Sequence, residues 1–160
     1  MADNSDLVET FWKQYCLTMQ KADETNCMEK IPSAWGFGDS PEMADDLLAY
    51  VLTGEKTATS GMLSDFEHDG DPVPKKGDKN IILNGEKEPK CVIEFVDVQQ
   101  KKFNEVDEVF ALKEAEGFKS LQDWRDLHWD FFSRRCKDLG VPLYEEIMLV
   151  CMEFKLIYKA

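Results

Sequence analysis

The sequence has few basic residues compared with acidic ones. It contains 19 Lys and Arg against 32 Asp and Glu, which gives a formal net charge of -13. Proteins that hold long nucleic acids without regard to sequence use bulk positive charge to bind the phosphates. The charge balance therefore argues against that class of function, and any RNA partner must be held by a local basic patch.

Paired metal-binding cysteines are also missing. The five cysteines lie far apart in the chain and form no C-x-x-C pair: Cys16, Cys27, Cys91, Cys136 and Cys151. Neither of the two histidines has the spacing of a zinc ligand to them. We therefore expect no metal and no cofactor, and we expect most thiols to be small core residues in a reducing, cytoplasmic compartment.

Long apolar runs are absent as well, so we expect neither secretion nor membrane insertion and no membrane partner. What is present suits one globular domain, because 43% of the 160 residues are hydrophobic and can fill a core. The sequence does not predict the oligomeric state.

Apolar residues at three- and four-residue spacings predict helices over residues 5–21, 41–53, 105–116 and 121–139. Alternating, β-branched or aromatic stretches predict strands over residues 55–60, 81–83, 91–98 and 147–158. Residues 35–39 and 65–79 are predicted to be loops, because glycine, aspartate and proline gather there. Helices and strands do not alternate regularly, which favours the α+β class.

An aromatic, glycine-containing loop is the first candidate for function. In Trp35-Gly36-Phe37-Gly38-Asp39 the glycines give the backbone freedom and the rings offer stacking surfaces for a flat group such as a nucleobase. The alternative is a buried aromatic loop that covers the core.

The second candidate is Gly54-Glu55-Lys56-Thr57-Ala58-Thr59, where Lys56 precedes a strand whose two threonines share one face. A partly buried lysine amine can take a proton from a threonine hydroxyl and turn it into a nucleophile. The alternative is an exposed lysine followed by two strand-forming threonines.

The third candidate is Glu116, which is followed by Gly117 and, further on, by Trp124 and His128. A carboxylate close to aromatic groups can act as a general acid or base. It can equally be a solvated glutamate, and His128 can be a core or pocket-wall residue in place of a metal ligand. Residues 67–71 are acidic, but they lack the register of a calcium loop, so we expect a solvated turn there.

Taken in order, these stretches resemble the ASCH domain family from about Trp35 to the C-terminus. The matching pieces are Trp35-x-Phe37-Gly38-Asp39, Ala44-Asp45-x-Leu47, Gly54-x-Lys56-Thr57-x-Thr59, Glu116-Gly117, Trp124-x-x-x-His128 and Phe131-Phe132. The resemblance implies an ASCH domain over residues 31–160, preceded by an N-terminal helical extension over residues 1–30. It also implies a PUA-like β-barrel with helices packed around it, similar to domains that recognise RNA.

The resemblance further implies an activity. Some small family members hydrolyse the amide of N4-acetylcytidine with a lysine, a threonine three residues later and a distant glutamate. Here these residues correspond to Lys56, Thr59 and Glu116, with Glu114 as the alternative carboxylate. The expected substrate-binding residues are Trp35, Phe37, Gly38, Asp39, Tyr50, Thr57, Trp124, His128 and Ser133.

We therefore expect a small amidohydrolase whose partner is a nucleoside or nucleotide. One alternative is a module that binds RNA through a basic patch formed by Lys75, Lys76, Lys101, Lys102, Arg134 and Arg135. Another is a metal-dependent ribonuclease, an activity reported for other family members. The acidic balance favours the hydrolase, because a single nucleoside can be held without phosphate contacts.

Overall fold

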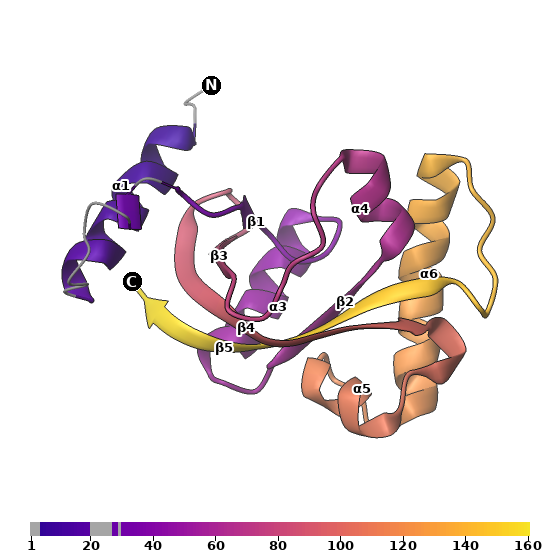
Figure 1. Cartoon of the computed structure of the whole chain (residues 1–160). Coiled ribbons are helices and arrows are strands. Elements are labelled where there is room, and N and C mark those ends of the chain that lie inside the picture. Colours follow the sequence, from indigo (N-terminus) through magenta and orange to yellow (C-terminus); the bar gives the residue numbers. More distant parts are fainter. Residues whose placement is uncertain (1–3, 20–26, 29) are drawn as a thin grey trace. The chain divides into compact units, whose positions relative to one another are not determined.

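Figure 1 shows the structure, a computed structural model that describes residues 4–19, 27–28 and 30–160. The described elements, in chain order, are α1 (Ser5–Thr18), β1 (Ala34–Trp35), α3 (Pro41–Leu52), β2 (Ala58–Met62), α4 (Leu63–Asp69), β3 (Lys79–Leu83), β4 (Pro89–Lys102), the 3-10 helix η1 (Phe103–Glu105), α5 (Glu108–Glu114), α6 (Leu121–Leu139) and β5 (Met148–Lys159).

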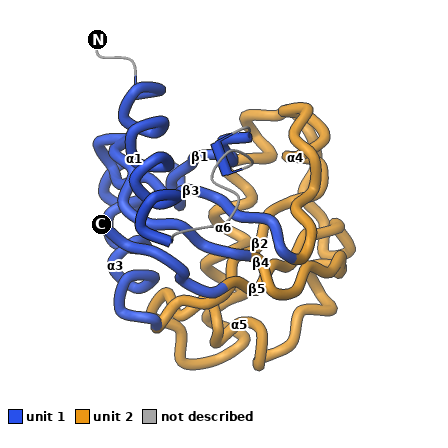
Figure 2. The backbone as a smooth tube through the Cα atoms, turned by 60° about the vertical axis from the view of Figure 1, so that its left-hand side comes forward, with its two compact units in different colours: residues 1–54, 77–94, 155–160 blue, residues 55–76, 95–154 orange. Residues whose placement is uncertain are grey.

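The chain folds into two compact units, coloured separately in Figure 2. Unit 1 contains residues 1–54, 77–94 and 155–160, and unit 2 contains residues 55–76 and 95–154. Strands β4 and β5 each contribute residues to both units, whereas the elements that carry Lys56 and Glu116 belong to unit 2 alone.

The strands form a mixed sheet in the order β1-β3-β4-β5-β2. Strand β1 runs parallel to β3, whereas β3 with β4 and β2 with β5 are antiparallel pairs. The predicted α+β class is confirmed. The expected PUA-like barrel is not, because over the described residues the sheet is open, with β1 and β2 as its two edges.

The starts of two helices agree with the sequence prediction and have a local cause. The Ser40 hydroxyl accepts a hydrogen bond from the Met43 amide at 3.1 Å at the start of α3. The Ser120 hydroxyl accepts one from the Asp123 amide at 3.2 Å at the start of α6. Both side chains satisfy an amide that has no partner inside its helix. Helix α6 then ends at Gly140, which adopts the left-handed conformation.

Several predicted boundaries are wrong, among them that of the strand expected over residues 55–60, which is β2 at Ala58–Met62. Helix α4 lies where residues 65–79 were expected to be a loop, and it ends at Gly70 in the left-handed conformation. Strand β1 begins just before the expected loop at residues 35–39, and Trp35 pairs with Ile82. Helix α5 covers only Glu108–Glu114 of the predicted span 105–116, because Ala115 turns into the left-handed region. This last difference determines where Glu116 lies.

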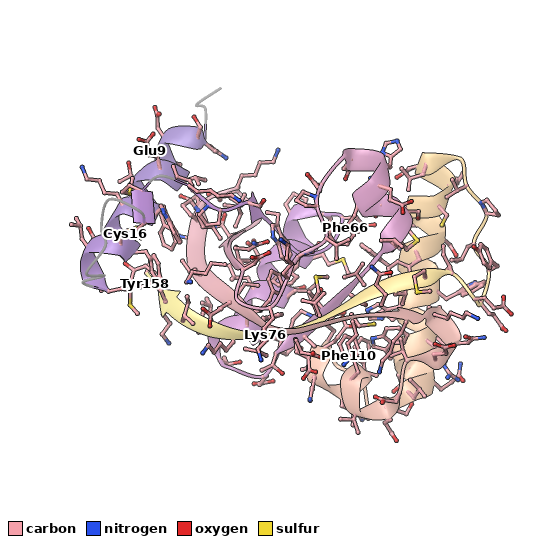
Figure 3. The ribbon with its side chains drawn as sticks, in the orientation of Figure 1. Glu9, Cys16, Phe66, Lys76, Phe110 and Tyr158 are labelled. Atoms are coloured by element: carbon pink, nitrogen blue, oxygen red, sulfur yellow. A yellow bond between two sulfur atoms is a disulfide. The ribbon has the colours of Figure 1, made fainter. Side chains whose placement is uncertain are left out.

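Unit 1 has its own core, in which α1 takes part. Trp12 and Tyr15 of α1 pack with Ile81 and Val92 of the sheet. The ring of Tyr158 on β5 lies 5.5 Å from that of Tyr15, in an edge-on arrangement. Figure 3 labels Tyr158 and Cys16 in this part of the chain. The predicted N-terminal helix is therefore a packed part of unit 1.

The cysteines depart in part from the expectation of free thiols. Cys16 and Cys27 form a disulfide, whereas Cys91, Cys136 and Cys151 are free and buried. Burial raises the pKa of the Cys91 and Cys151 thiols to about 12, so these two stay protonated. The core role expected of the thiols is confirmed for the three free cysteines. Within the described residues, no helix combines the length and apolar character that a membrane span needs.

Unit 2 has a second core, which supports the candidate site. Trp124 and Phe132 of α6 pack there with Ala58 and Met62 of β2 and with Phe110 of α5, which is labelled in Figure 3. Helix α5 contacts both β2 and α6. The end of α5 is thereby held against the start of β2.

Candidate functional site

Backbone hydrogen bonds fix the segment that carries Lys56. The Thr57 amide donates to the Lys113 carbonyl of α5 at 2.8 Å, and the Phe154 amide donates to the Thr57 carbonyl at 2.9 Å. The residue just before β2 is thereby tied to α5 on one side and to β5 on the other. Lys56 thus starts from a rigid backbone and has little freedom to move away from α5.

The Lys56 ammonium lies at the centre of the site and is fully buried. Its Nζ donates to the Ala58 carbonyl at 2.9 Å, to the Glu114 carbonyl at 3.1 Å and to Glu116 Oε1 at 2.6 Å. The same Nζ lies 3.7 Å from Glu114 Oε1. A lysine ammonium has three N–H donors, and these three acceptors use all of them. In this arrangement Lys56 is a donor, which differs from the role of proton acceptor expected from the sequence.

Glu114 is buried and ionised. Its Oε2 accepts hydrogen bonds from Trp124 Nε1 at 2.7 Å and from Ser60 Oγ at 2.9 Å, and its Oε1 lies 3.2 Å from His128 Nε2. Burial alone would raise the pKa of this carboxyl. The charge and hydrogen bond of His128, followed by the Lys56 charge and the Trp124 hydrogen bond, lower the pKa to about 2 instead. Glu114 is therefore a fixed anion.

Glu116 reaches Lys56 because the chain turns sharply after α5. Ala115 has φ 51° and Gly117 has φ 92°, so two left-handed residues flank Glu116. The side chain of Glu116 is 8% exposed. Its Oε1 binds Lys56, and a small part of the side chain remains exposed to solvent.

The three predicted catalytic residues do not all meet. Lys56 and Glu116 are in direct contact, but Thr59 pairs with Met152 in β2, next to Ser60. Successive side chains of a strand point to opposite faces, so Thr59 is directed away from the face on which Ser60 binds Glu114. The hydroxyl that lies with the charged groups is therefore that of Ser60.

Two of the residues expected to bind substrate contact the charged groups. Trp124 and His128 of α6 are buried, their rings stack with centroids 4.2 Å apart, and both bind Glu114. Ser133 donates to the Trp129 carbonyl at 2.6 Å within the same helix. Thr57 contributes its backbone to the bonds described above.

The remaining expected binding residues belong to unit 1. Phe37 is buried with its ring edge-on to Trp35, whose Nε1 donates to Asn80 Oδ1 at 2.7 Å. Gly38 has φ 77°, and a Cβ there would lie 2.5 Å from the Met43 side chain. For Phe37 the alternative of a buried aromatic loop is confirmed.

Asp39 and Tyr50 complete the expected set in unit 1. Asp39 is exposed just before α3, and Tyr50 is half-buried near the end of that helix. The substrate-binding role of these predicted residues is a proposal.

Sequence reasoning missed Ser60 and left Glu114 as an alternative to Glu116. A signal for Glu114 was its place two residues before Glu116, within reach of the same lysine. For Ser60 the signal was the strand alternation, which puts Ser60 on the same side of β2 as Ala58.

Glu114, Glu116 and His128 offer ligand atoms within 4.8 Å of one another, close enough to share an ion. The Lys56 ammonium already lies against both carboxylates, however. We therefore assign Lys56 as the cation of this cluster and derive no step through a metal.

The comparisons with known proteins agree with this fold. The family model for the ASCH domain matches residues 33–158, and the chain therefore belongs to the ASCH domain family. No curated protein matches the chain.

Solved structures extend the likeness to almost the whole chain. A crystal structure of a protein from Enterococcus faecalis V583 is 31% identical, with a TM-score of 0.83, and the match covers 95% of this chain and 88% of that one. The structure of an ASCH domain from Lactobacillus crispatus JV V101 is 29% identical, with a TM-score of 0.85 and 96% of each chain covered. The hypothetical protein PH0355, 15% identical with a TM-score of 0.50, covers 78% of this chain and 99% of its own and shares the fold alone.

Proposed function

We propose that this ASCH protein hydrolyses the amide bond of a small acylated nucleoside, with N4-acetylcytidine as the test substrate. One observation carries the proposal: Glu116 is held by Lys56 through Oε1 while a small part of its side chain remains exposed to solvent. A carboxylate that is held in place and still partly accessible can take a proton from water and give it up again. The resemblance to amidohydrolase members of the family supports the same residues.

The reaction balances with the groups present. Glu116 takes a proton from a water molecule, and the water oxygen attacks the acyl carbonyl while the carbonyl electron pair moves to oxygen. The carbonyl re-forms as the C–N bond breaks, and Glu116 delivers its proton to the leaving nitrogen. Cytidine and acetic acid are released, and the acid gives its proton to solvent. Lys56 holds the carboxylate in position during both transfers.

Thr59 is the rival nucleophile suggested by the sequence. The variant Thr59→Val keeps the shape of the side chain and removes the hydroxyl. If water attacks, Thr59→Val retains most of the wild-type turnover. If Thr59 forms an acyl-enzyme, Thr59→Val loses turnover and a burst of cytidine precedes the steady state in the wild type.

The test of the function itself is cytidine release from N4-acetylcytidine by the purified wild-type chain, followed by chromatography. Turnover supports the proposal, and complete inertness at high enzyme concentration overturns it. An RNA oligonucleotide incubated in parallel tests the ribonuclease alternative, which predicts cleavage that a chelator abolishes.

The ion pairs of unit 2 support the RNA-binding alternative less than the hydrolase. Of the six cations expected to form a basic patch, Arg134 pairs with Asp130, and Arg135 Nε donates to Asp65 at 2.6 Å. These carboxylates offset part of the positive charge that a phosphate would need. Binding that weakens steeply with salt would favour this alternative.

Three further expectations also stay proposals: the PUA-like relationship, the cytoplasmic location and the domain boundary between residues 30 and 31.

A further inference from the structure

Both ring nitrogens of His128 face hydrogen-bond acceptors. Nδ1 lies 2.9 Å from the Trp124 carbonyl oxygen, and Nε2 lies 3.2 Å from Glu114 Oε1. A neutral imidazole has one N–H donor and one acceptor, so it can satisfy only one of these contacts. An imidazolium has two donors and satisfies both. The geometry therefore matches the protonated form of the ring.

The surroundings of His128 are aromatic on its faces and anionic at its edge. The ring stacks on Trp124 and contacts Phe118 and Phe132. Burial by itself lowers the pKa of the ring, but the charge and hydrogen bond of Glu114, and then the charge of Glu116, raise it overall. The attraction between the ring and the two carboxylates thus outweighs the cost of burying a charged imidazole.

With both carboxylates ionised, the charges of the cluster balance only if His128 is protonated. Glu114 and Glu116 carry two negative charges, and Lys56 supplies one positive charge. Lys56, Glu114 and Glu116 are the charged groups that face the ring, directly or through Glu114. Two buried carboxylates that share a single cation favour uptake of a proton by one of them. A second cation removes that tendency.

We propose that His128 is a positioning residue that carries its second proton throughout the neutral pH range, where it is the second cation of the cluster and offsets the negative charge of the two carboxylates. Its catalytic consequence rests on the proposed function, because Glu116 must be ionised to take a proton from water. The protonation itself does not depend on any activity. The role differs from the substrate contact that the sequence suggested for His128.

The direct test is an NMR titration of the histidine ring nitrogens in the full chain labelled with ¹⁵N-histidine. The chain has two histidines, and the exposed His68 on α4 provides an internal reference. We expect both nitrogens of His128 to have imidazolium shifts at pH 7, and His128 to lose its proton at higher pH than His68. A neutral His128 ring at pH 7 would overturn the proposal.

Two variants identify the source of the effect. Glu114→Gln is expected to move the His128 midpoint down by about 1 pH unit or more, a tenfold change in the protonated fraction, and to leave His68 unchanged. Should that variant fail to fold, Glu116→Gln removes the more distant charge and is expected to give a smaller shift in the same direction. An unchanged midpoint in the folded variant contradicts the proposal.

The catalytic consequence is measured separately. His128→Gln keeps a donor for Glu114 without the charge, and we expect the acid limb of its kcat profile to move to higher pH with little change in KM. The matched control His68→Gln is expected to keep the wild-type profile. An unshifted acid limb in His128→Gln overturns the positioning role, whereas an inactive wild type with a protonated His128 overturns the proposed function alone.

Discussion

Lys56 Nζ lies 2.6 Å from Glu116 Oε1, and both side chains are almost completely removed from solvent. The two residues are 60 positions apart, so this contact joins the start of β2 to the turn after α5. A buried ion pair gains stability only when its polar atoms are satisfied, and here the remaining Lys56 donors bind two backbone carbonyls. The pair therefore links the stability of unit 2 to the geometry of the candidate site.

Replacing Lys56 with methionine removes the charge and keeps a similar length. Glu114 and Glu116 then remain buried without this cation, and breaking such a pair costs about 3–5 kcal/mol. We expect Lys56→Met to lower the free energy of unfolding by that amount in urea denaturation.

The matched control is Lys113→Met, at the position directly before Glu114. Lys113 Nζ binds Glu153 Oε1 at 2.6 Å, but the pair is open to solvent. Exposed ion pairs contribute about 0–1 kcal/mol, so the control is expected to remain close to wild type. Equal losses in the two variants would contradict the role assigned to Lys56.

Trp124→Phe removes the indole N–H that binds Glu114 and keeps an aromatic ring. A buried acceptor that loses a partner costs about 1–3 kcal/mol, and we expect that loss in thermal or urea unfolding. Trp129→Phe is the control, because the Trp129 ring is partly exposed and lies edge-on to Phe103. If Trp129→Phe is the more destabilising change, packing outweighs the hydrogen bond.

The stability of the protein should depend on pH in two windows. The pKa of Glu114 is lowered from 4.5 to about 2 on folding, so its contribution is present above pH 4.5 and is lost as the pH falls toward 2. The pKa of His128 is raised from 6.5, so its contribution is complete below pH 6.5 and is lost as the pH rises through the folded value.

Urea unfolding at a series of pH values measures both windows. We expect His128→Gln to flatten the alkaline decline in the free energy of unfolding while the acid decline remains. A wild-type curve with no decline above pH 6.5 would disagree with the raised pKa of His128.

The disulfide predicts how many cysteine thiols react with a thiol reagent. With Cys16 and Cys27 joined, the unfolded protein should react at three thiols before reduction and at five afterwards. Five reactive thiols in protein purified without reductant would show that the disulfide does not form under those conditions.

Much of the fold follows from local sequence signals. Ser40 and Ser120 mark helix starts, because their hydroxyls bind amides only three residues away. Strand β1 gave no such signal, because its two residues depend on parallel pairing with β3, far along the chain. Helix α4 was missed because aspartate and glycine composition is also typical of loops.

For the same reason, only part of the candidate site could be predicted from the sequence. Lys56 and Glu116 were found by their motif, and their contact depends on long-range packing. The direction of Thr59 follows from the register of β2 with β5, and the position of Glu116 follows from a left-handed conformation at Ala115, a residue type that seldom adopts it. Neither can be read from composition or spacing.

The most direct measurement of the central claim is cytidine release from N4-acetylcytidine by Glu116→Gln, compared with Glu108→Gln, an exposed glutamate of α5 in the same unit. Near-neutral pH and intact folding, checked by urea unfolding, make the two variants comparable. We predict that Glu116→Gln loses about 10²–10⁴-fold in kcat while Glu108→Gln matches the wild type. Wild-type turnover by Glu116→Gln would contradict the account.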